Sequence, residues 1–230
     1  MNVTSMHTAF QIGVDKVSSL NYPGFEPEEI DFILNQAQDR FVKTRYGRNN
    51  TYRKGFEETQ KRTDDIRNIV KNAIIVPAPS IASNKPNGQY VTLPNTATDI
   101  YWFAVEEEVS VTTTDCNGNR IVRRLPVKPI THDVYNNIIK DPFNKPFEDE
   151  VIRLANEGFF ELITIPSITI NQYLLRYVRQ PRRIDLTTSV DCELSEHTHQ
   201  EIVDIACGIA LEGIESKRFQ TNTIETSKQE

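Results

Sequence analysis

The sequence predicts an α+β fold in which the N-terminal helices and the C-terminal helix form a helical core, with an inserted, mainly antiparallel β module. Two observations lead to this prediction. Apolar residues recur at helical spacing near both ends of the chain, and from Ala73 the spacing changes to strand-like alternation. The expected regions are an N-terminal arm and helical part over residues 1–72, a β module over 73–190, and a C-terminal helix with an extended tail over 191–230.

Composition limits the classes of protein that the chain can belong to. With 230 residues it can bury a full hydrophobic core. Its formal net charge of −6 argues against a general affinity for nucleic acid or anionic membranes, which repel an acidic body. The N-terminus lacks an apolar signal-peptide segment and no apolar run reaches bilayer length, so we expect neither a signal peptide nor a membrane span. Cys116, Cys192 and Cys207 are widely spaced, which favours free thiols in a reducing compartment.

The N-terminal region predicts one strong helix between two less regular segments. Residues 1–25 have scattered apolar groups and indicate an extended arm with one helical turn at most. A helix over Pro27–Tyr46 follows, because Pro27 suits a first helical position and Gly47 a helix end. A more polar helix is expected over Tyr52–Asn72. The predicted core face of the Pro27 helix comprises Ile30, Ile33, Leu34, Ala37 and Phe41.

The central region predicts short strands, one short helix and several turns. Apolar residues occupy odd positions of the longest strand from Tyr101 to Val111, which indicates one buried face. Thr131 is placed to cap a short helix that ends at Ile139. The expected strands are 74–76, 90–93, 100–114, 120–128, 151–155, 159–165, 168–170 and 172–179.

The turn around Asn117 and Gly118 sets the register of the central hairpin. A two-residue Asn-Gly loop would place Arg124 beside Val111 on the buried face. A three-residue loop, 117–119, instead pairs Val111 with Leu125 and Val109 with Val127, and we favour it for that reason.

The C-terminal segment Leu194–Phe219 predicts an amphipathic helix that packs on the N-terminal helices. Ser195 is a suitable N-cap, and acidic residues near the start with basic residues near the end suit the helix dipole. Beyond Phe219 the chain is polar. The predicted core face comprises Ile202, Ile205, Ala206 and Ile209.

The sequence gives no catalytic residue, metal ligand or cofactor site, and we expect the protein not to be an enzyme. No phosphate loop, nucleophile elbow or Cys-x-x-Cys pair is present. His197 and His199 lie two residues apart, which points them in different directions on a helix. Glu107 interrupts the apolar face of its strand, so it lies at a bulge or pairs with a cation such as Arg123.

Two groups of basic and aromatic residues are candidate binding surfaces. The first follows the Pro27 helix and comprises Arg40, Lys43, Arg45, Tyr46, Arg48, Tyr52, Arg53 and Lys54. The second, in and after the last strand, comprises Tyr173, Arg176, Tyr177, Arg179, Arg182 and Arg183. Such residues serve nucleic-acid binding and protein interfaces alike, and the acidic total favours a protein interface.

Three segments resemble virion proteins of tailed bacteriophages: YPGFEPEEIDFILNQAQDRFVKTRYG, NQYLLRYVRQPRRIDL and ELSEHTHQEIVDIACGIALEGIESKRF. The likeness is to head-to-tail connector (ring or adaptor) proteins of podoviruses, particularly of crAss-like phages. The resemblance covers the two ends and the last strand. The region from Ile74 to Ile165 is compatible with such a protein in its strand-like pattern but adds little to the resemblance.

The resemblance implies a structural subunit of the virion at the portal vertex. It implies a ring, commonly of twelve copies, that contacts the portal and neighbouring ring or tail proteins and surrounds passing DNA without binding it specifically. Pro27–Tyr46, Tyr52–Asn72 and Ser195–Phe219 would form the ring wall. Gln220–Glu230 would dock on the portal, with Phe219 and Ile224 joining the second basic and aromatic group as interface residues. A tail-tube or minor capsid component, and a nucleic-acid-binding protein, remain alternatives.

Overall fold

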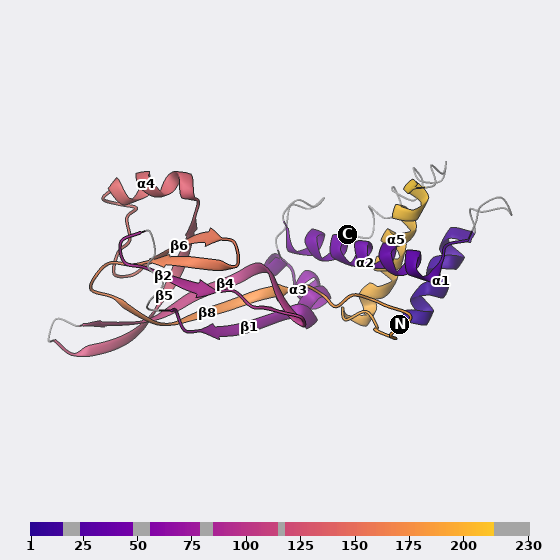
Figure 1. The fold of residues 1–230 in the computed structure, drawn as a ribbon, viewed down its shortest axis with the longest axis horizontal. Helices are drawn as coiled ribbons and strands as arrows, with labels where there is room; N and C mark the ends of the chain where they lie inside the picture. The colour runs from indigo at the N-terminus through magenta and orange to yellow at the C-terminus, as the bar shows by residue number, and fades with distance from the viewer. Residues whose placement is uncertain (16–23, 48–55, 79–84, 115–117, 214–230) are drawn as a thin grey trace. The chain divides into compact units, whose positions relative to one another are not determined.

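The computed structural model describes residues 1–15, 24–47, 56–78, 85–114 and 118–213, and they form two compact units (Figure 1). The helical unit contains the described residues of Met1–Ile69 and Pro181–Glu230. The β unit is Val70–Gln180. The α+β fold class predicted from the sequence is confirmed.

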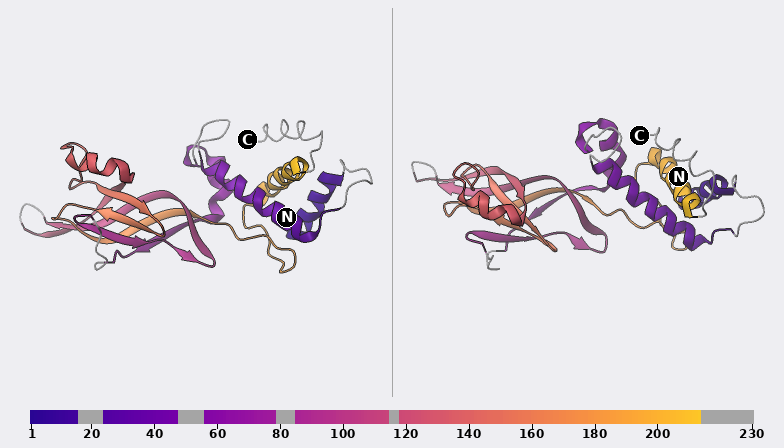
Figure 2. Two further views of the ribbon diagram at one scale, coloured as in Figure 1. Left: turned by 45° about the horizontal axis from the view of Figure 1, so that its top comes forward. Right: turned by 90° about the horizontal axis from the view of Figure 1, so that it is seen from above.

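The helical unit consists of helices from both ends of the chain. The C-terminal helix packs against the first two helices, and Figure 2 shows the three together. Its elements are α1 (Val3–Asp15), α2 (Pro27–Tyr46), η1 (Phe56–Glu58), α3 (Gln60–Ile66), η2 (Arg67–Ile69), η3 (Glu196–Thr198) and α5 (His199–Gly213).

Helix α1 corrects the prediction of an extended N-terminal arm. Its thirteen residues bury Val3, Met6, Phe10 and Val14, a spacing of three and four residues that fits one helical face. Asn2 caps the helix, because its side-chain Oδ1 accepts a hydrogen bond from the Ser5 N–H at 2.8 Å. The periodicity is present in the sequence, but it is short and interrupted by polar residues.

Helix α2 has the predicted bounds. Pro27 occupies the first turn, and the N–H of the preceding Glu26 donates to the Glu29 carboxylate at 3.0 Å. At the other end the Gly47 N–H donates to the Lys43 carbonyl at 3.0 Å.

The helix predicted over Tyr52–Asn72 is shorter and broken. Within the described residues it is divided into η1, α3 and η2, and residues 70–72 belong to a strand. Ile66 and Ile69 are buried in the helical unit, whereas Val70 already pairs with Val178 in the sheet. Strand pairing therefore overrides the local helical preference at this boundary.

Within its described residues, the β unit is a curled sheet of eight strands with one helix. The order of the strands is β1-β8-β4-β5-β6-β7-β2, with β3 paired to β4. All neighbours are antiparallel except β5 and β6. The elements are β1 (Val70–Ile75), β2 (Gly88–Thr92), β3 (Asn95–Thr96), β4 (Asp99–Thr114), β5 (Arg120–Ile130), α4 (His132–Lys140), β6 (Val151–Asn156), β7 (Phe159–Ile163) and β8 (Thr169–Arg179).

The sheet curls until segments from its two ends meet. Ala78, just after β1, forms a bridge with Tyr90 of β2, and its N–H donates to the Tyr90 carbonyl at 3.1 Å. The curled sheet encloses the main core of the unit, and α4 covers the other side of β6 and β7 through Tyr135. The enclosed core comprises Val91, Leu93, Val109, Val111, Leu125, Val151, Phe160, Leu162, Ile168, Ile170, Tyr173, Leu175 and Tyr177.

The β4–β5 hairpin has the predicted facing but a different register. Val109 pairs with Leu125 and Val111 with Arg123, so residues 115–119 connect the strands instead of 117–119. The prediction of three loop residues is therefore wrong, although β4 and β5 lie within two residues of the strand bounds expected from the sequence. Burial fixes which residues share a face, but a shift of two residues preserves that facing, so the apolar pattern could not distinguish the two registers.

Strand β8 joins the two segments predicted as 168–170 and 172–179. Ser110 pairs with Gln172 and Val111 with Ile170, which leaves Asn171 as an extra residue in a bulge. The Asn171 side-chain amide donates to the Thr112 hydroxyl at 2.8 Å. The polar residue that divided the sequence pattern thus marks an irregularity within one strand.

The segment after β8 belongs to the helical unit, although the β module was expected to continue to residue 190. The Ile184 N–H donates to the Asn35 side chain at 2.8 Å, and the Gln38 side chain donates to the Arg182 carbonyl at 2.9 Å. Two polar residues of α2 thereby hold an irregular segment along this helix.

The C-terminal helix begins later than predicted. The Ser195 hydroxyl donates to the Asp64 carbonyl at 2.8 Å and so links α3 to the start of η3, instead of capping the helix. Helix α5 proper starts at His199, and the predicted end at Phe219 lies outside the described residues.

Candidate subunit interface

The predicted interface strand β8 faces the core of the β unit with its tyrosines. Tyr173 and Tyr177 are almost completely buried. The Tyr173 hydroxyl donates to Glu107 at 2.8 Å, and Tyr177 is hydrogen-bonded to Asp99. Burial raises the pKa of Tyr177 to about 12 and raises the pKa of Tyr173 further. The two tyrosines therefore belong to the core of this unit and not to a surface that a partner could reach.

Glu107 pairs with a cation, which was one of the two alternatives, but the cation is not Arg123. The Arg153 Nε lies 2.9 Å from the Glu107 carboxylate, and the Arg153 guanidinium lies over the Phe160 ring. Arg123 pairs with Asp149 instead, at 3.3 Å. Burial raises the pKa of Glu107, although Arg153 and Tyr173 act in the opposite direction. This polar group fixes β4 to β6 and β8 inside the curled sheet.

The four predicted interface arginines differ in exposure. Arg179 is buried and donates to the Gln180 carbonyl at 3.1 Å, and Arg176 is half-buried on β8. Arg182 and Arg183 are exposed in the helical unit, where Arg183 pairs with Asp39 at 2.9 Å. The structure thus does not bring the six residues to one surface, and Phe219 and Ile224 lie outside the described residues.

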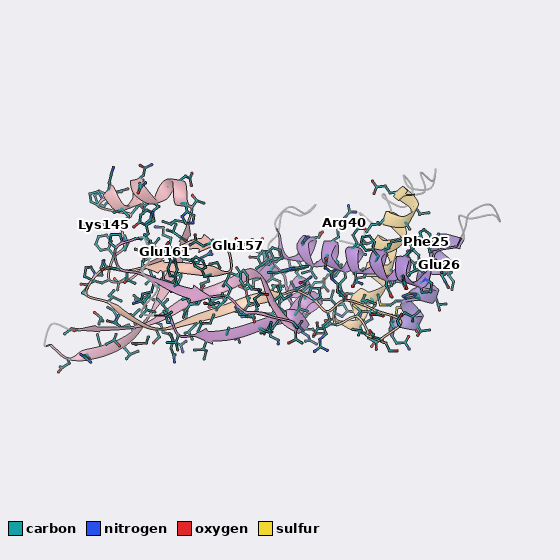
Figure 3. All side chains as sticks on the ribbon, viewed as in Figure 1. Phe25, Glu26, Arg40, Lys145, Glu157 and Glu161 are labelled. Atoms are coloured by element: carbon teal, nitrogen blue, oxygen red, sulfur yellow. The ribbon has the colours of Figure 1, made fainter. Side chains whose placement is uncertain are left out.

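One residue of the first basic group, Arg45, is also buried. Arg45, at the end of α2, is buried and forms ion pairs with Asp65 of α3, at 2.9 Å, and with Glu201 of α5. Its guanidinium lies over the Phe41 ring, 4.7 Å from the centroid. Arg40, by contrast, is exposed on α2, where Figure 3 labels it. Arg45 therefore joins three helices, while Arg48, Tyr52, Arg53 and Lys54 lie outside the described residues.

The histidines considered as metal ligands bind different partners. His197 lies 2.9 Å from Asp65, whereas the His199 Nε2 lies 3.0 Å from the Leu194 carbonyl and its Nδ1 lies 2.9 Å from the N-terminal amine. Among the residues that the structure describes, no group of three His, Cys, Asp or Glu side chains could hold a metal ion.

The predicted helical core divides into a buried set and a partly exposed set. Ile30, Leu34, Ala37, Phe41, Ile202 and Ala206 are buried. Ile33, Ile205 and Ile209 are only partly covered within the described chain. Three of the nine predicted core positions therefore keep part of their surface uncovered by the described residues.

The structure also exposes large apolar side chains that sequence reasoning did not select. They lie on the outer faces of α1 and α2, on β1 and directly after it, on β5, and on α4 with the loop that follows it. These residues are Ile12, Phe32, Ile74, Val76, Ile121, Val122, Val134, Ile139, Phe143 and Phe147. The sequence signal for these residues was an apolar side chain on the polar face of a helix or strand, such as Phe32 among charged neighbours. Exposed apolar groups mark a contact surface only where they form a contiguous patch, and these residues are distributed over both units.

A family model described as phage tail ring protein 3/4 matches residues 1–224. The chain belongs to this family. The match covers both units, and the phage ring protein resemblance inferred from the sequence is confirmed.

Two ring proteins of Bacteroides phage crAss001 are similar to this ring protein. Ring protein 4/5 is 27% identical over 233 residues, which cover 91% of this chain and 92% of the relative. Ring protein 3 is 25% identical over 206 residues, covering 81% of this chain and 84% of the relative. One phage thus carries two related ring proteins.

Family membership identifies the protein as a structural ring protein of a crAss-like phage virion. The described helices of the ring protein include none long and apolar enough to cross a membrane. The features built above fit a structural subunit: buried ion pairs hold elements together, and apolar side chains lie at the surface of both units.

Proposed function

We propose that this ring protein forms a closed ring of identical subunits in the head-to-tail connector, between the portal and the tail. The single observation that carries the proposal is the family match over residues 1–224, because it includes all the described residues of both units. The ring contains twelve copies, as in the connectors that the sequence resembles. Its neighbours are the portal and another ring or tail protein.

The exposed apolar side chains support assembly into a ring. A closed ring requires two different surfaces on each subunit, because each copy contacts one neighbour on either side. Phe32 on α2 is 70% exposed and Phe143 after α4 is 89% exposed, so each unit presents apolar surface to a partner.

The charge of the chain suits a wall around moving DNA. A net charge of −6 disfavours adhesion of phosphates during passage. Burial of Tyr173, Tyr177 and Arg45 also removes aromatic and basic groups that a nucleic-acid-binding surface would need. Passage of DNA without specific binding is therefore the function that we infer, in preference to DNA recognition.

A ring within the tail is the second candidate, and the word "tail" in the family description favours it. Cryo-electron microscopy of the virion distinguishes the two. Density for this chain as a closed ring next to the portal supports the connector, whereas density further along the tail supports a tail component. Absence of the chain from the particle would refute both.

Binding of DNA is tested separately with the purified chain and a duplex of random sequence. We expect no measurable binding at 150 mM salt, on the order of physiological ionic strength. Tight binding that weakens steeply as salt rises would contradict the proposal and support the nucleic-acid alternative.

A further inference from the structure

One part of the sheet has two unpaired edges that face away from each other. In the order β1-β8-β4-β5, strand β1 pairs only with β8 among the described strands, and the bridge between Ala78 and Tyr90 of β2 lies beyond its last residue, Ile75. At the other side, β5 pairs with β6 only from Val127 onward, so its residues 120–125 pair only with β4 within the described part of the chain. Figure 1 shows this hairpin projecting beyond the other strands of the β unit. Unpaired backbone edges of this kind bind further strands.

The directions of the four strands allow the same sheet to continue into another copy. Each neighbouring pair is antiparallel, so β1 and β4 run one way and β8 and β5 run the other. If β5 of one copy lies beside β1 of the next, that new pair is antiparallel too. A head-to-tail repeat of this kind joins two different surfaces, as a closed ring requires.

The side chains on the two edges also match. Ala73 and Ile75 of β1 pack against the core, so Ile74 points outward, and it is 67% exposed. On β5, Leu125 faces the core and Val122 is 69% exposed. Because Val122 lies three residues from Leu125, the alternation of a strand places it on the outer face. Edge-to-edge pairing places both β-branched side chains on the same outer face, where cross-strand pairs of this type stabilise sheets.

Three of the four basic residues on these two edges are already paired within the chain, and Arg120 is the fourth. Lysine and arginine on an edge strand usually oppose pairing with another chain. Here Lys71 of β1 lies 3.5 Å from Asp99, Arg123 of β5 lies 3.3 Å from Asp149, and Arg124 lies 3.5 Å from Glu108. The repulsion between the two edges is therefore reduced.

We propose that copies of this chain join edge to edge, with residues 120–125 of β5 in one copy pairing antiparallel with β1 of the next. The inference rests on the proposed ring and names the surface that closes it. The occupant of each edge is a second copy, because the two edges complement each other in direction, facing and side-chain type.

Cysteine cross-linking tests this pairing. One preparation carries Ile74→Cys and another Val122→Cys, both with Cys116→Ser. Mixed and mildly oxidised, they are expected to form disulfide-linked dimers at least about tenfold faster than either preparation alone, because pairing holds the two thiols within bonding distance. A matched control mixes Ile74→Cys with Asn136→Cys, because Asn136 is also exposed, on α4, but lies on neither edge. Equal or faster cross-linking in the control would overturn the proposal, as would failure to cross-link at the highest soluble concentration.

A charge on the edge gives a second test. Ile74→Lys is expected to reduce the assembled mass measured by light scattering, whereas Asn136→Lys, on the exposed side of α4, is expected to leave it unchanged, with unchanged circular dichroism in both. Equal assembly of the two variants would refute edge pairing. A ring seen in the virion without the Ile74–Val122 cross-link would overturn only this inference, whereas absence of the chain from the virion would refute the proposed function.

Discussion

Gly13 of α1 lies directly against Cys207 of α5. A Cβ atom built on Gly13 would lie 2.6 Å from the Cys207 Sγ, closer than such atoms approach in proteins. The absence of a side chain at residue 13 therefore lets the first and last helices of the helical unit approach each other closely. Phe10, one turn earlier, accepts a hydrogen bond from the Cys207 thiol through its carbonyl at 3.7 Å.

Gly13→Ala is expected to destabilise the helical unit by about 1–3 kcal/mol, because the added methyl group overpacks the contact with Cys207. The free energy of unfolding in urea measures the effect. Cys207→Ala removes the clashing sulfur, so the double variant should lose less than the sum of the single variants, with a coupling energy of about 1 kcal/mol or more. If the losses in the two single variants add up in the double variant, residues 13 and 207 do not interact, and the close contact between α1 and α5 is refuted.

Glu107→Gln tests the buried carboxyl in the β unit. Burial raises the pKa of Glu107 in the folded state above its ordinary value of 4.5. Between pH 4.5 and the raised pKa, the folded protein therefore binds more protons than the unfolded chain does. The stability of the parent protein should therefore fall, relative to the variant, as pH rises from 4.5 toward the raised pKa. Urea unfolding between acidic and neutral pH measures the difference.

The matched control for that experiment is Glu148→Gln, which removes a charge from the exposed loop after α4. If the parent protein instead becomes more stable than the Glu107→Gln variant as pH rises, the ionised form of Glu107 is favoured in the folded state. Attraction to Arg153 would then exceed the cost of burial, and folding would lower the pKa of Glu107 instead of raising it.

The described cysteines should be unreactive in the folded protein. Burial raises the pKa of Cys192 to about 11 and that of Cys207 to about 12, so almost no thiolate is present at neutral pH. In a Cys116→Ser variant, a thiol-specific chromogenic reagent should label no cysteine before unfolding and both after denaturation. Rapid labelling of the native variant would show that the helical unit opens readily.

Two isoleucines of α5 should differ in their response to a charge. Ile202 is completely buried, so Ile202→Asp would place an unpaired carboxylate in the core and should prevent soluble folding. Ile205 is partly exposed, so Ile205→Asp should yield folded protein with a smaller loss of stability. Yield and thermal unfolding of the soluble fraction compare them. Equal loss in both would place Ile205 in the core as well.

Strong periodicity made α2 and the long strands predictable, because a wide apolar stripe or a sustained alternation has few interpretations. Helix α1 was missed because its stripe is short and broken by polar residues. The hairpin register was missed because a shift of two residues leaves Val109 and Leu125 on the same face. A local pattern shows which side chains share a face of a strand or helix. The length of a loop and the distance between two packed helices depend on residues far away in the sequence, such as Cys207.

The interface prediction shows the same limit. Tyrosine and arginine on β8 have the composition of a binding surface, yet Tyr173 and Tyr177 fill the curled sheet. Composition does not tell on which side of a sheet a residue lies when the sheet closes on itself. Ile74 continues an apolar run with Ile75, and that run predicts a strand without indicating which of its residues face outward.

The β unit begins and ends at paired strands, since Val70 lies opposite Val178. The chain therefore enters and leaves this unit at neighbouring points, and a short turn could bridge them in its place. Such a unit can be exchanged between genes, or diverge in sequence, while the helices that flank it keep their own packing. Changes confined to the β unit therefore leave the points where the flanking helices enter and leave it in place.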